Sequence, residues 1–359
     1  MSSTRTLTKI IAMILCLVMA LTCLTACGGS SASSDEVLSQ NGDKPGTVIE
    51  ETDEYVTIVD QAGREVTAKK KPETIALCYR VIIRFLLNLE QGDKIVGVGK
   101  SEKFLDELEP NIANAVDVGK GVADVEAVAE LNPDIFLHKA SDVETLDAIQ
   151  DLGIPSVGIR VENQEDMVTA FEIMGKICGK EDKAKELIDF YNSHIEKCQS
   201  LTKDIENKKS AIVMGSSIGK VADGSMLQGN MIEIAGGINC ADELKATELW
   251  PTAGAEQIFA WNPDYIFITN QEGAVYDADD ILNDPAWSEI TAVKNKDVYV
   301  MPAKEDSWEL PGIVSVIGIE YMIRTMYPDL LSDEELEKDV NDLYELSYGK
   351  TFERDELGY

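Results

Sequence analysis

The chain has 359 residues, of which 44% are hydrophobic and 27% are charged, and its formal net charge at pH 7 is −33. A surface this negative repels the phosphates of nucleic acids and the anionic headgroups of lipids, and no basic stripe in the sequence reverses that effect. We therefore expect no nucleic-acid partner. The length suffices for two domains of ordinary size, each with its own core.

The N-terminus has the pattern of an export signal. Basic residues precede an almost wholly apolar run over residues 10–21, and the sequence LTAC ends at Cys27. The run is shorter than the roughly 20 residues that span a bilayer. Small residues before a cysteine resemble the bacterial lipoprotein signal, in which the cysteine is lipidated. We predict a lipoprotein signal peptide over residues 1–26 and a lipid anchor on Cys27, which would hold the mature protein at the cell surface or in the periplasm. The alternative is a membrane-anchoring helix with an incidental cysteine.

The next two segments are a tether and a first α/β lobe. Residues 27–54 are rich in Ser, Gly and Asp, which predicts a flexible tether. Residues 55–162 alternate apolar strand-like runs with helical patterns, as doubly wound α/β folds do. The expected strands lie at 74–78, 94–99, 134–138 and 154–159, and the expected helices at 81–90 and 142–152.

A long helical pattern separates this lobe from a second one. It runs over residues 164–201, with breaks in register at Gly175 and Gly179. We predict one long connecting helix within residues 163–205, acting as a stiff strut. A second α/β lobe is expected over residues 206–330, followed by an acidic C-terminal helix or tail over residues 331–359. The expected strands of this lobe lie at 210–215, 264–269 and 297–302, and the expected helices at 226–237, 278–282 and 311–326.

The two lobes share an internal repeat. Residues 123–137 read ADVEAVAELNPDIFL, and residues 253–267 read AGAEQIFAWNPDYIF. In each copy a short amphipathic helix with one acidic residue near its start ends at Asn-Pro and leads into an apolar strand. Two related lobes in one chain predict a ligand held between them.

These motifs together give a specific resemblance. The repeat, the helical spacer, MIEIAGGINCADE at residues 231–243 and DPAWSEITAVKNKDVYVMP at residues 284–302 resemble the helical-backbone (class III) substrate-binding proteins of bacterial ABC transporters. The resemblance covers roughly residues 56–330 and implies two Rossmann-like lobes joined by one long α-helix, with the ligand cleft between the lobes. It also implies a monomer that binds a ferric siderophore, haem or cobalamin and passes it to an ABC permease dimer with its ATPase.

Ligands of open α/β sheets lie beyond the carboxyl ends of the strands. Several residues at these ends are cationic or aromatic, which favours an anionic ligand, because arginine pairs with carboxylate or catecholate oxygens and aromatic rings offer flat faces. Each residue taken alone could instead be a solvated loop residue. Arg84, inside the following helix, is expected to be a structural partner of an acidic residue. The candidate ligand-binding residues are Tyr79, Arg80, Lys139, Arg160, Asn270, Lys304 and Trp308.

The acids of the repeat, Glu126 and Glu256, match another feature of the class. In those proteins one glutamate on each lobe pairs with arginines of the permease, so the resemblance implies that these two residues dock the permease. A carboxylate in the first turn of a helix is also favoured by the helix dipole, which leaves a purely structural alternative.

An enzymatic function finds no support in the motifs, because the chain has no HExxH, P-loop or GxGxxG motif, and we expect neither an enzyme nor a cofactor. A site for free zinc or manganese usually needs several imidazoles, and only His138 and His194 are present. His138 could reach a metal centre, while His194 is expected to face solvent. The leading interpretation is a lipid-anchored binding protein for an iron chelate, with a ferric siderophore as the leading candidate ligand. The alternatives are a haem- or cobalamin-binding protein of the same class and a ligand-sensing surface lipoprotein without a permease.

Overall fold

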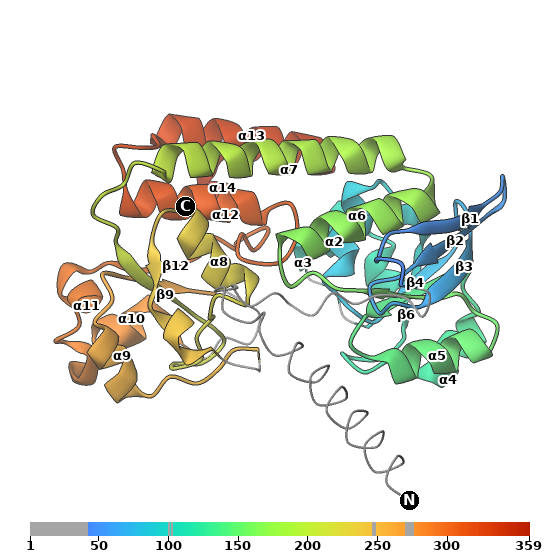
Figure 1. Ribbon diagram of the computed structural model, residues 1–359, viewed down its shortest axis with the longest axis horizontal. Coiled ribbons are helices and arrows are strands. Elements are labelled where there is room, and N and C mark those ends of the chain that lie inside the picture. The colour runs from blue at the N-terminus through green and yellow to red at the C-terminus, as the bar shows by residue number, and fades with distance from the viewer. Residues whose placement is uncertain (1–41, 100, 102, 246–248, 270–275) are drawn as a thin grey trace, which may run out of the picture. The chain divides into compact units, whose positions relative to one another are not determined.

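The structure is a computed structural model that describes residues 42–359, except residues 100, 102, 246–248 and 270–275 (Figure 1). The expected signal peptide, Cys27 and Asn270 lie outside the described residues. Among the helices that are described, none is both long and apolar enough to cross a membrane.

The first lobe contains a five-stranded parallel sheet in the order β6-β5-β4-β7-β8. Its central strands are short apolar runs buried on both faces, as strands of a covered parallel sheet are. Helices α4 and α5 cover one face of this sheet (Figure 1). A small hydrophobic cluster that includes Phe136 lies between these helices and the sheet. The strands are β4 (Ile75–Leu77), β5 (Ile95–Val98), β6 (Val116–Asp117), β7 (Ile135–Lys139) and β8 (Ser156–Ile159); the helices are α2 (Ile82–Asn88), α3 (Lys103–Leu108), α4 (Val125–Leu131) and α5 (Val143–Asp151).

The second lobe contains a four-stranded parallel sheet in the order β10-β9-β11-β12. The two sheets confirm the α/β fold class with two lobes. The strands are β9 (Ser210–Met214), β10 (Ile238–Asn239), β11 (Tyr265–Ile268) and β12 (Val298–Val300); the helices are α8 (Leu227–Ile234), α9 (Ala255–Trp261), α10 (Ala278–Leu282) and α11 (Thr291–Asn295).

An antiparallel sheet of β1 (Val48–Glu51), β2 (Tyr55–Val59) and β3 (Glu65–Lys69) precedes the first lobe. Strand β1 lies inside the segment that we predicted to be a tether, so that tether ends earlier than residue 54. The sequence of β1 is exposed and polar, and its order comes from pairing with β2, which no local pattern reveals.

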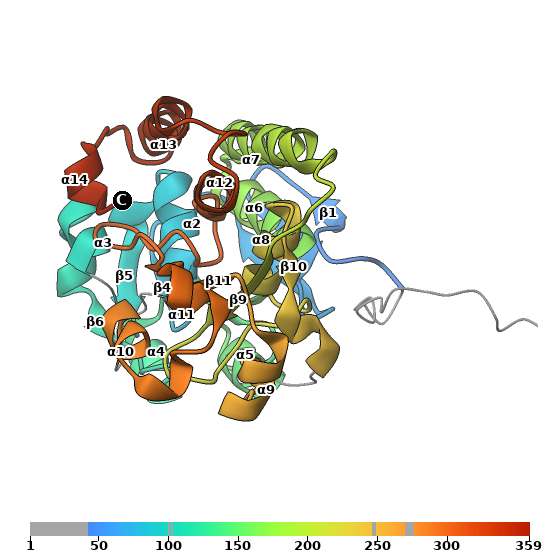
Figure 2. The same cartoon turned by 90° about the vertical axis from the view of Figure 1, so that its left-hand side faces the viewer.

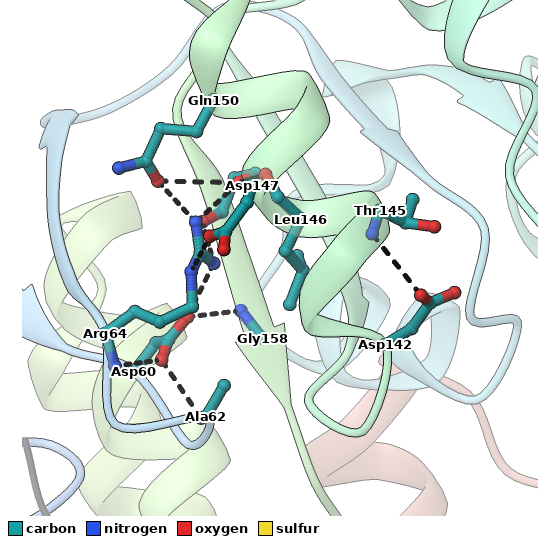
Figure 3. A network of polar contacts seen from close by, with 10 residues as sticks. Asp60, Ala62, Arg64, Asp142, Thr145, Leu146, Asp147, Gln150 and Gly158 are labelled. Carbon is teal, nitrogen blue, oxygen red and sulfur yellow. Dashed lines mark hydrogen bonds and ion pairs between the residues drawn. The ribbon is translucent and has the colours of Figure 1, made fainter.

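The turn between β2 and β3 is attached to the first lobe through a buried carboxylate (Figure 3). Asp60 accepts hydrogen bonds from the backbone N–H groups of Ala62, Arg64 and Gly158 and from the Arg64 guanidinium. Arg64 also pairs with Asp147 of α5. Burial raises the pKa of Asp60, although all four donors oppose that shift. The network joins the hairpin to β8 and α5.

The segment predicted as one connecting helix contains two. Helix α6 (Gln164–Cys178) ends at Gly179, which is left-handed at φ 64°, and α7 (Glu181–Thr202) begins two residues later. Helices α6 and α7 then pack against each other, with Gly175 close to Ala184. The prediction of a single helix over residues 163–205 is therefore wrong, because Gly179 adopts a conformation that ends a helix. Only α7 has the length of a strut.

Helix α7 packs against α6 of the first lobe and against α8 and α12 (Ser315–Met326) beside the second. Helix α13 (Asp333–Tyr348) lies next to α7 and α12, and Figure 2 shows these three helices nearly end-on; α14 (Arg354–Leu357) follows. One large hydrophobic cluster includes residues of β4, α2, α6, α7, α12 and β9. The two lobes are therefore joined by a shared core as well as by chain connections.

Candidate functional site

A cavity of about 440 Å³ lies at the carboxyl ends of β4 and β7 in the first lobe. Tyr79 and Arg80 follow β4, Lys139 ends β7, and Lys120 comes from the turn after β6. Three cationic side chains therefore line one cavity, although the chain as a whole is strongly negative. Parallel strands bring these residues together because their carboxyl ends share one edge of the sheet. Tyr79, Arg80 and Lys139 were predicted from the sequence.

Lys120 was missed by the sequence analysis. Strand β6 has only two residues, Val116 and Asp117, so its end carries no recognisable apolar run. The turn that follows depends on Gly119, which has φ +108°, and a side chain there would meet the Val122 carbonyl oxygen. The spacing Gly119-Lys120-Gly121 is the signal that could have revealed a turn presenting a lysine.

The lysines of this cavity have no acidic partner among the residues that the structure describes. In the part of the chain that the structure describes, neither Lys120 nor Lys139 forms an ion pair, and the Lys139 ammonium lies 3.5 Å from the Gly121 carbonyl oxygen. A cation that lacks an acidic partner attracts anions more strongly than a paired one, because its charge is not compensated locally. The cavity is suited to an anionic ligand.

Tyr79 forms part of the cavity wall. Burial raises the pKa of the Tyr79 hydroxyl well above its usual range, and the charges of Glu162 and Asp166 raise it further. The hydroxyl is therefore protonated at neutral pH and can donate a hydrogen bond to an anionic oxygen. The flat ring can also contact a large ligand.

Arg160 follows β8 as predicted, but its charge is largely compensated. Both its Nε and one terminal nitrogen lie 2.8 Å from the Asp166 carboxylate, which is itself 5% exposed. Arg160 does not line the cationic cavity. The pair fixes the start of α6, because Asp166 also accepts a hydrogen bond from the Asn163 side chain.

Two residues predicted after β12 lie elsewhere. Trp308 has no exposed surface, and its indole N–H donates to the Tyr344 hydroxyl, so it offers no face to a ligand in this structure. The sequence could not show that helix α13 covers it. Lys304 is exposed, and its ammonium donates to the Asp355 carbonyl oxygen near the C-terminus. Neither residue lines the cationic cavity.

The histidines serve internal contacts. His138 is fully buried, with Nε2 lying 3.0 Å from the Asp142 carboxylate, and burial lowers the pKa of its imidazole. It does not line the cavity. His194 was expected to face solvent, which is wrong, because its Nδ1 lies 2.7 Å from Glu320. His194, Glu320 and Asp339 could together hold a metal ion, but Lys197 pairs with both acids and already supplies a positive charge there.

Arg84 behaves as predicted. It is almost completely buried in α2, and its Nε donates to Asp306 at 2.6 Å. Tyr348 of α13 donates to the other oxygen of the same carboxylate. The pair connects the first lobe with the loop after β12, so Arg84 has a structural role.

Three apolar residues lie in the described part of the corresponding rim of the second lobe. Ile218, in the loop after β9, and Leu249 are both exposed, at 43% and 57%. The ring of Trp250 packs on Gly215, where any side chain would collide with it. Sequence reasoning missed these residues because isolated apolar side chains in loops carry no periodic signal.

A second cavity, of about 550 Å³, lies between α6, α7 and α8. Its lining includes Glu165, Glu172 and several amide side chains, and no lysine or arginine. An anion would find no charge partner there. The first-lobe cavity is therefore the better candidate for an anionic ligand.

Glu126 and Glu256 are both exposed, each in the first turn of its helix, α4 or α9. The two helices end in the same way, at Asn132 and Asn262, which are left-handed with φ 48° and 46°. The repeat seen in the sequence is thus a structural repeat. Figure 1 shows α4 and α9 on the side of the two sheets opposite to α7.

The model of the periplasmic binding protein family matches residues 75–305, so the chain belongs to that family. Three similar proteins span most of the chain. The molybdate-binding protein MolA of Haemophilus influenzae is 24% identical over 83% of this chain and 92% of its own length, and the solved structure of MolA bound to molybdate gives a TM-score of 0.73, covering 83% of this chain and 99% of that one.

The other two similar proteins come from Bacillus subtilis. The uncharacterized ABC transporter substrate-binding lipoprotein YvrC is 26% identical over 88% of this chain and 97% of its own length. The Fe(3+)-citrate-binding protein YfmC is 24% identical over 81% of this chain and 89% of its own length. The resemblance predicted from the sequence is confirmed by these matches.

Proposed function

We propose that this protein is the substrate-binding component of an ABC importer and that it binds an anionic iron chelate outside the cytoplasm. The observation that carries the proposal is the cavity lined by Arg80, Lys120 and Lys139 at the strand ends, where this fold places ligands. Family membership and the similarity to YvrC and YfmC support it. The iron complex is the transported cargo.

An organic chelate fits the site better than a bare oxyanion. The similarity to MolA, which is named for molybdate, supports a small oxyanion as a second candidate. The apolar residues Ile218, Leu249 and Trp250 of the second lobe would have no role in holding a small hydrated oxyanion. A chelate with an anionic centre and carbon-rich surroundings would use both the cationic and the apolar residues.

Membrane attachment and docking complete the proposal. A lipid on Cys27 would hold the protein at the membrane surface, and Glu126 and Glu256 would meet arginines of a permease dimer. The protein would act as a monomer. A sensor without a permease would need neither acid for its function. Replacing the two acids therefore distinguishes an importer component from a sensor.

The first test is a titration of the purified protein with five probes: ferric citrate, a ferric triscatecholate, haem, cobalamin and molybdate. We expect the tightest binding for one of the two ferric chelates. Replacing both Lys120 and Lys139 by Gln should weaken that binding at least about 100-fold, since each hydrogen bond to a charged group contributes about 1.5–3 kcal/mol. Isothermal calorimetry measures the affinity.

Lys304→Gln is the matched control, because Lys304 is exposed but lies outside the cavity. It should bind within about twofold of the unchanged protein. If molybdate, haem or cobalamin binds most tightly, the proposal of an iron chelate as the ligand is wrong. Unchanged affinity in the double lysine variant would remove the cavity as the binding site.

A further inference from the structure

The two helices of the repeat, α4 and α9, are alike in backbone but unlike in exposed chemistry. Along α4 and its N-cap, the exposed positions include three acids, Asp124, Glu126 and Glu130. At the equivalent positions, 130 residues later, Gly254, Glu256 and Ala260 are exposed, so only one acid is kept. The first-lobe helix therefore presents three negative charges and the second-lobe helix one.

Phe259 adds a second difference. Its side chain is 52% exposed, whereas the equivalent residue of the first lobe is Ala129. Phe259 follows Glu256 by three positions, which puts both side chains on the same face of α9. A large aromatic side chain exposed beside a charged residue is typical of the anchors of protein interfaces.

The polar side chains next to Glu256 and Phe259 on α9 are bonded elsewhere. The side chains of Gln257 and Trp261 both donate to Glu243, each at 2.5 Å, so their polar groups already have a partner within the lobe. Ile258 is buried in the core of the second lobe and fixes the orientation of α9. Glu256 and Phe259 point away from that core.

Resting on the proposed function, we propose that the two lobes dock the permease by different chemistry. Helix α4 makes a mainly electrostatic contact through Asp124, Glu126 and Glu130. Helix α9 makes a mainly apolar contact, in which Phe259 enters a hydrophobic pocket of the permease and Glu256 pairs with a cation at its edge. The partner surface for the second lobe is thus an apolar pocket flanked by arginine or lysine.

A second copy of this chain is a poorer occupant of the Phe259 face. The formal net charge of −33 makes two copies repel each other, and Glu256 beside Phe259 would add a like charge to any self-contact. A permease surface with cations complements both residues. Salt should therefore act differently on the two contacts, because screening weakens exposed charge pairs and leaves apolar burial in place.

The test measures binding of the Cys27→Ala form of the full chain, fluorescently labelled, to membrane vesicles from host cells that lack this gene. Specific binding is the part that excess unlabelled chain displaces, measured at 50 and 300 mM NaCl. We expect Phe259→Ala to raise the half-saturation concentration at least fivefold at both salt concentrations. Glu126→Gln should raise it clearly at 50 mM and much less at 300 mM.

Tyr55→Ala is the matched control, because Tyr55 is an aromatic residue of β2 with 49% exposure and no place in the repeat. It should bind like the unchanged chain, and circular dichroism should show that every variant folds. If Glu126→Gln loses binding and Phe259→Ala does not, the apolar contact is wrong while docking stands. If none of these variants changes binding, both are wrong. A Phe259-dependent dimer in solution would overturn the assignment of the permease as occupant.

Discussion

Asp242 shows how one carboxyl group in the second lobe makes stability depend on pH. Its pKa is raised to about 7, mainly by burial and then by a hydrogen bond to the neighbouring Glu233 carboxyl and by the charge of that residue. The Asn239 amide donates to Asp242 at 2.7 Å and opposes the shift. Below about pH 7 Asp242 is protonated, and above it the Asp242 charge meets the charge of Glu233.

The Asp242 and Glu233 pair should make the stability of the protein depend on pH. Because the folded-state pKa of Asp242 exceeds its ordinary value of 3.8, the native state binds more protons between these two pH values, and stability falls as pH rises from about 4 to about 7. Asp242→Asn should flatten this part of the curve, since an amide can donate to Glu233 at any pH. Melting temperatures measured from pH 4 to 8 check it, with the exposed Asp53→Asn as control. An unchanged slope in Asp242→Asn would contradict the assignment.

Some of the candidate site residues could be predicted from the sequence, and others could not. Tyr79, Arg80 and Lys139 were predictable, because each follows an apolar run that is long enough to be recognised as a strand. Lys120 follows a strand of two residues and was missed. Trp308 was predicted to face a ligand after β12, but it is buried against Tyr344, Tyr321 and Tyr359, and the sequence alone does not reveal these contacts.

At the scale of elements, α13 is attached to the rest of the protein by a buried charge cluster. Lys197 of α7 pairs with Glu320 of α12 and with Asp339 of α13, and His194 contacts the same glutamate. The Glu320 side chain is fully buried. One lysine therefore compensates two acids that are otherwise removed from water.

Lys197→Met should destabilise the protein by about 3 kcal/mol, because removing one partner leaves the buried acids uncompensated. Guanidinium unfolding measures the loss. Lys338→Met is the control, since Lys338 pairs with Asp342 on the exposed side of α13 and should change stability by less than about 1 kcal/mol. Equal losses in both variants would mean that the cluster has no special role.

Most elements with an apolar period were predictable, and the others form only through distant contacts. Short apolar runs such as IAL and IVGV are typical of buried strands in an α/β chain, and these two form strands β4 and β5. Strand β1 is exposed and polar, so only its partner β2 orders it. The break at Gly179 was visible as a change of register, but its left-handed conformation decides that α6 and α7 fold back on each other.

At the scale of the whole molecule, the shared core argues for a stiff link between the lobes. The cluster that includes β4, α6, α7, α12 and β9 is continuous, and Arg84 and Asp306 add a buried ion pair between the lobes. A large rearrangement on ligand binding would have to expose apolar surface, which costs about 25 cal/mol of free energy per Å². We expect small changes on binding, so that a permease recognises both lobes in nearly fixed positions.

The central claim, that the protein captures a ligand and delivers it to a permease through both lobes, is tested most directly by reversing Glu126 and Glu256 together. Glu126→Lys/Glu256→Lys should keep the affinity of the purified protein for its ferric chelate within about twofold, since distant surface changes act nearly independently of the site. Uptake of that chelate by cells should be lost, because like charges across an interface cost several kcal/mol. Asp53→Lys/Glu54→Lys, a reversal of two exposed acids outside the repeat, should transport normally. Normal uptake by the Glu126/Glu256 variant, or loss of its ligand affinity in solution, would contradict the account.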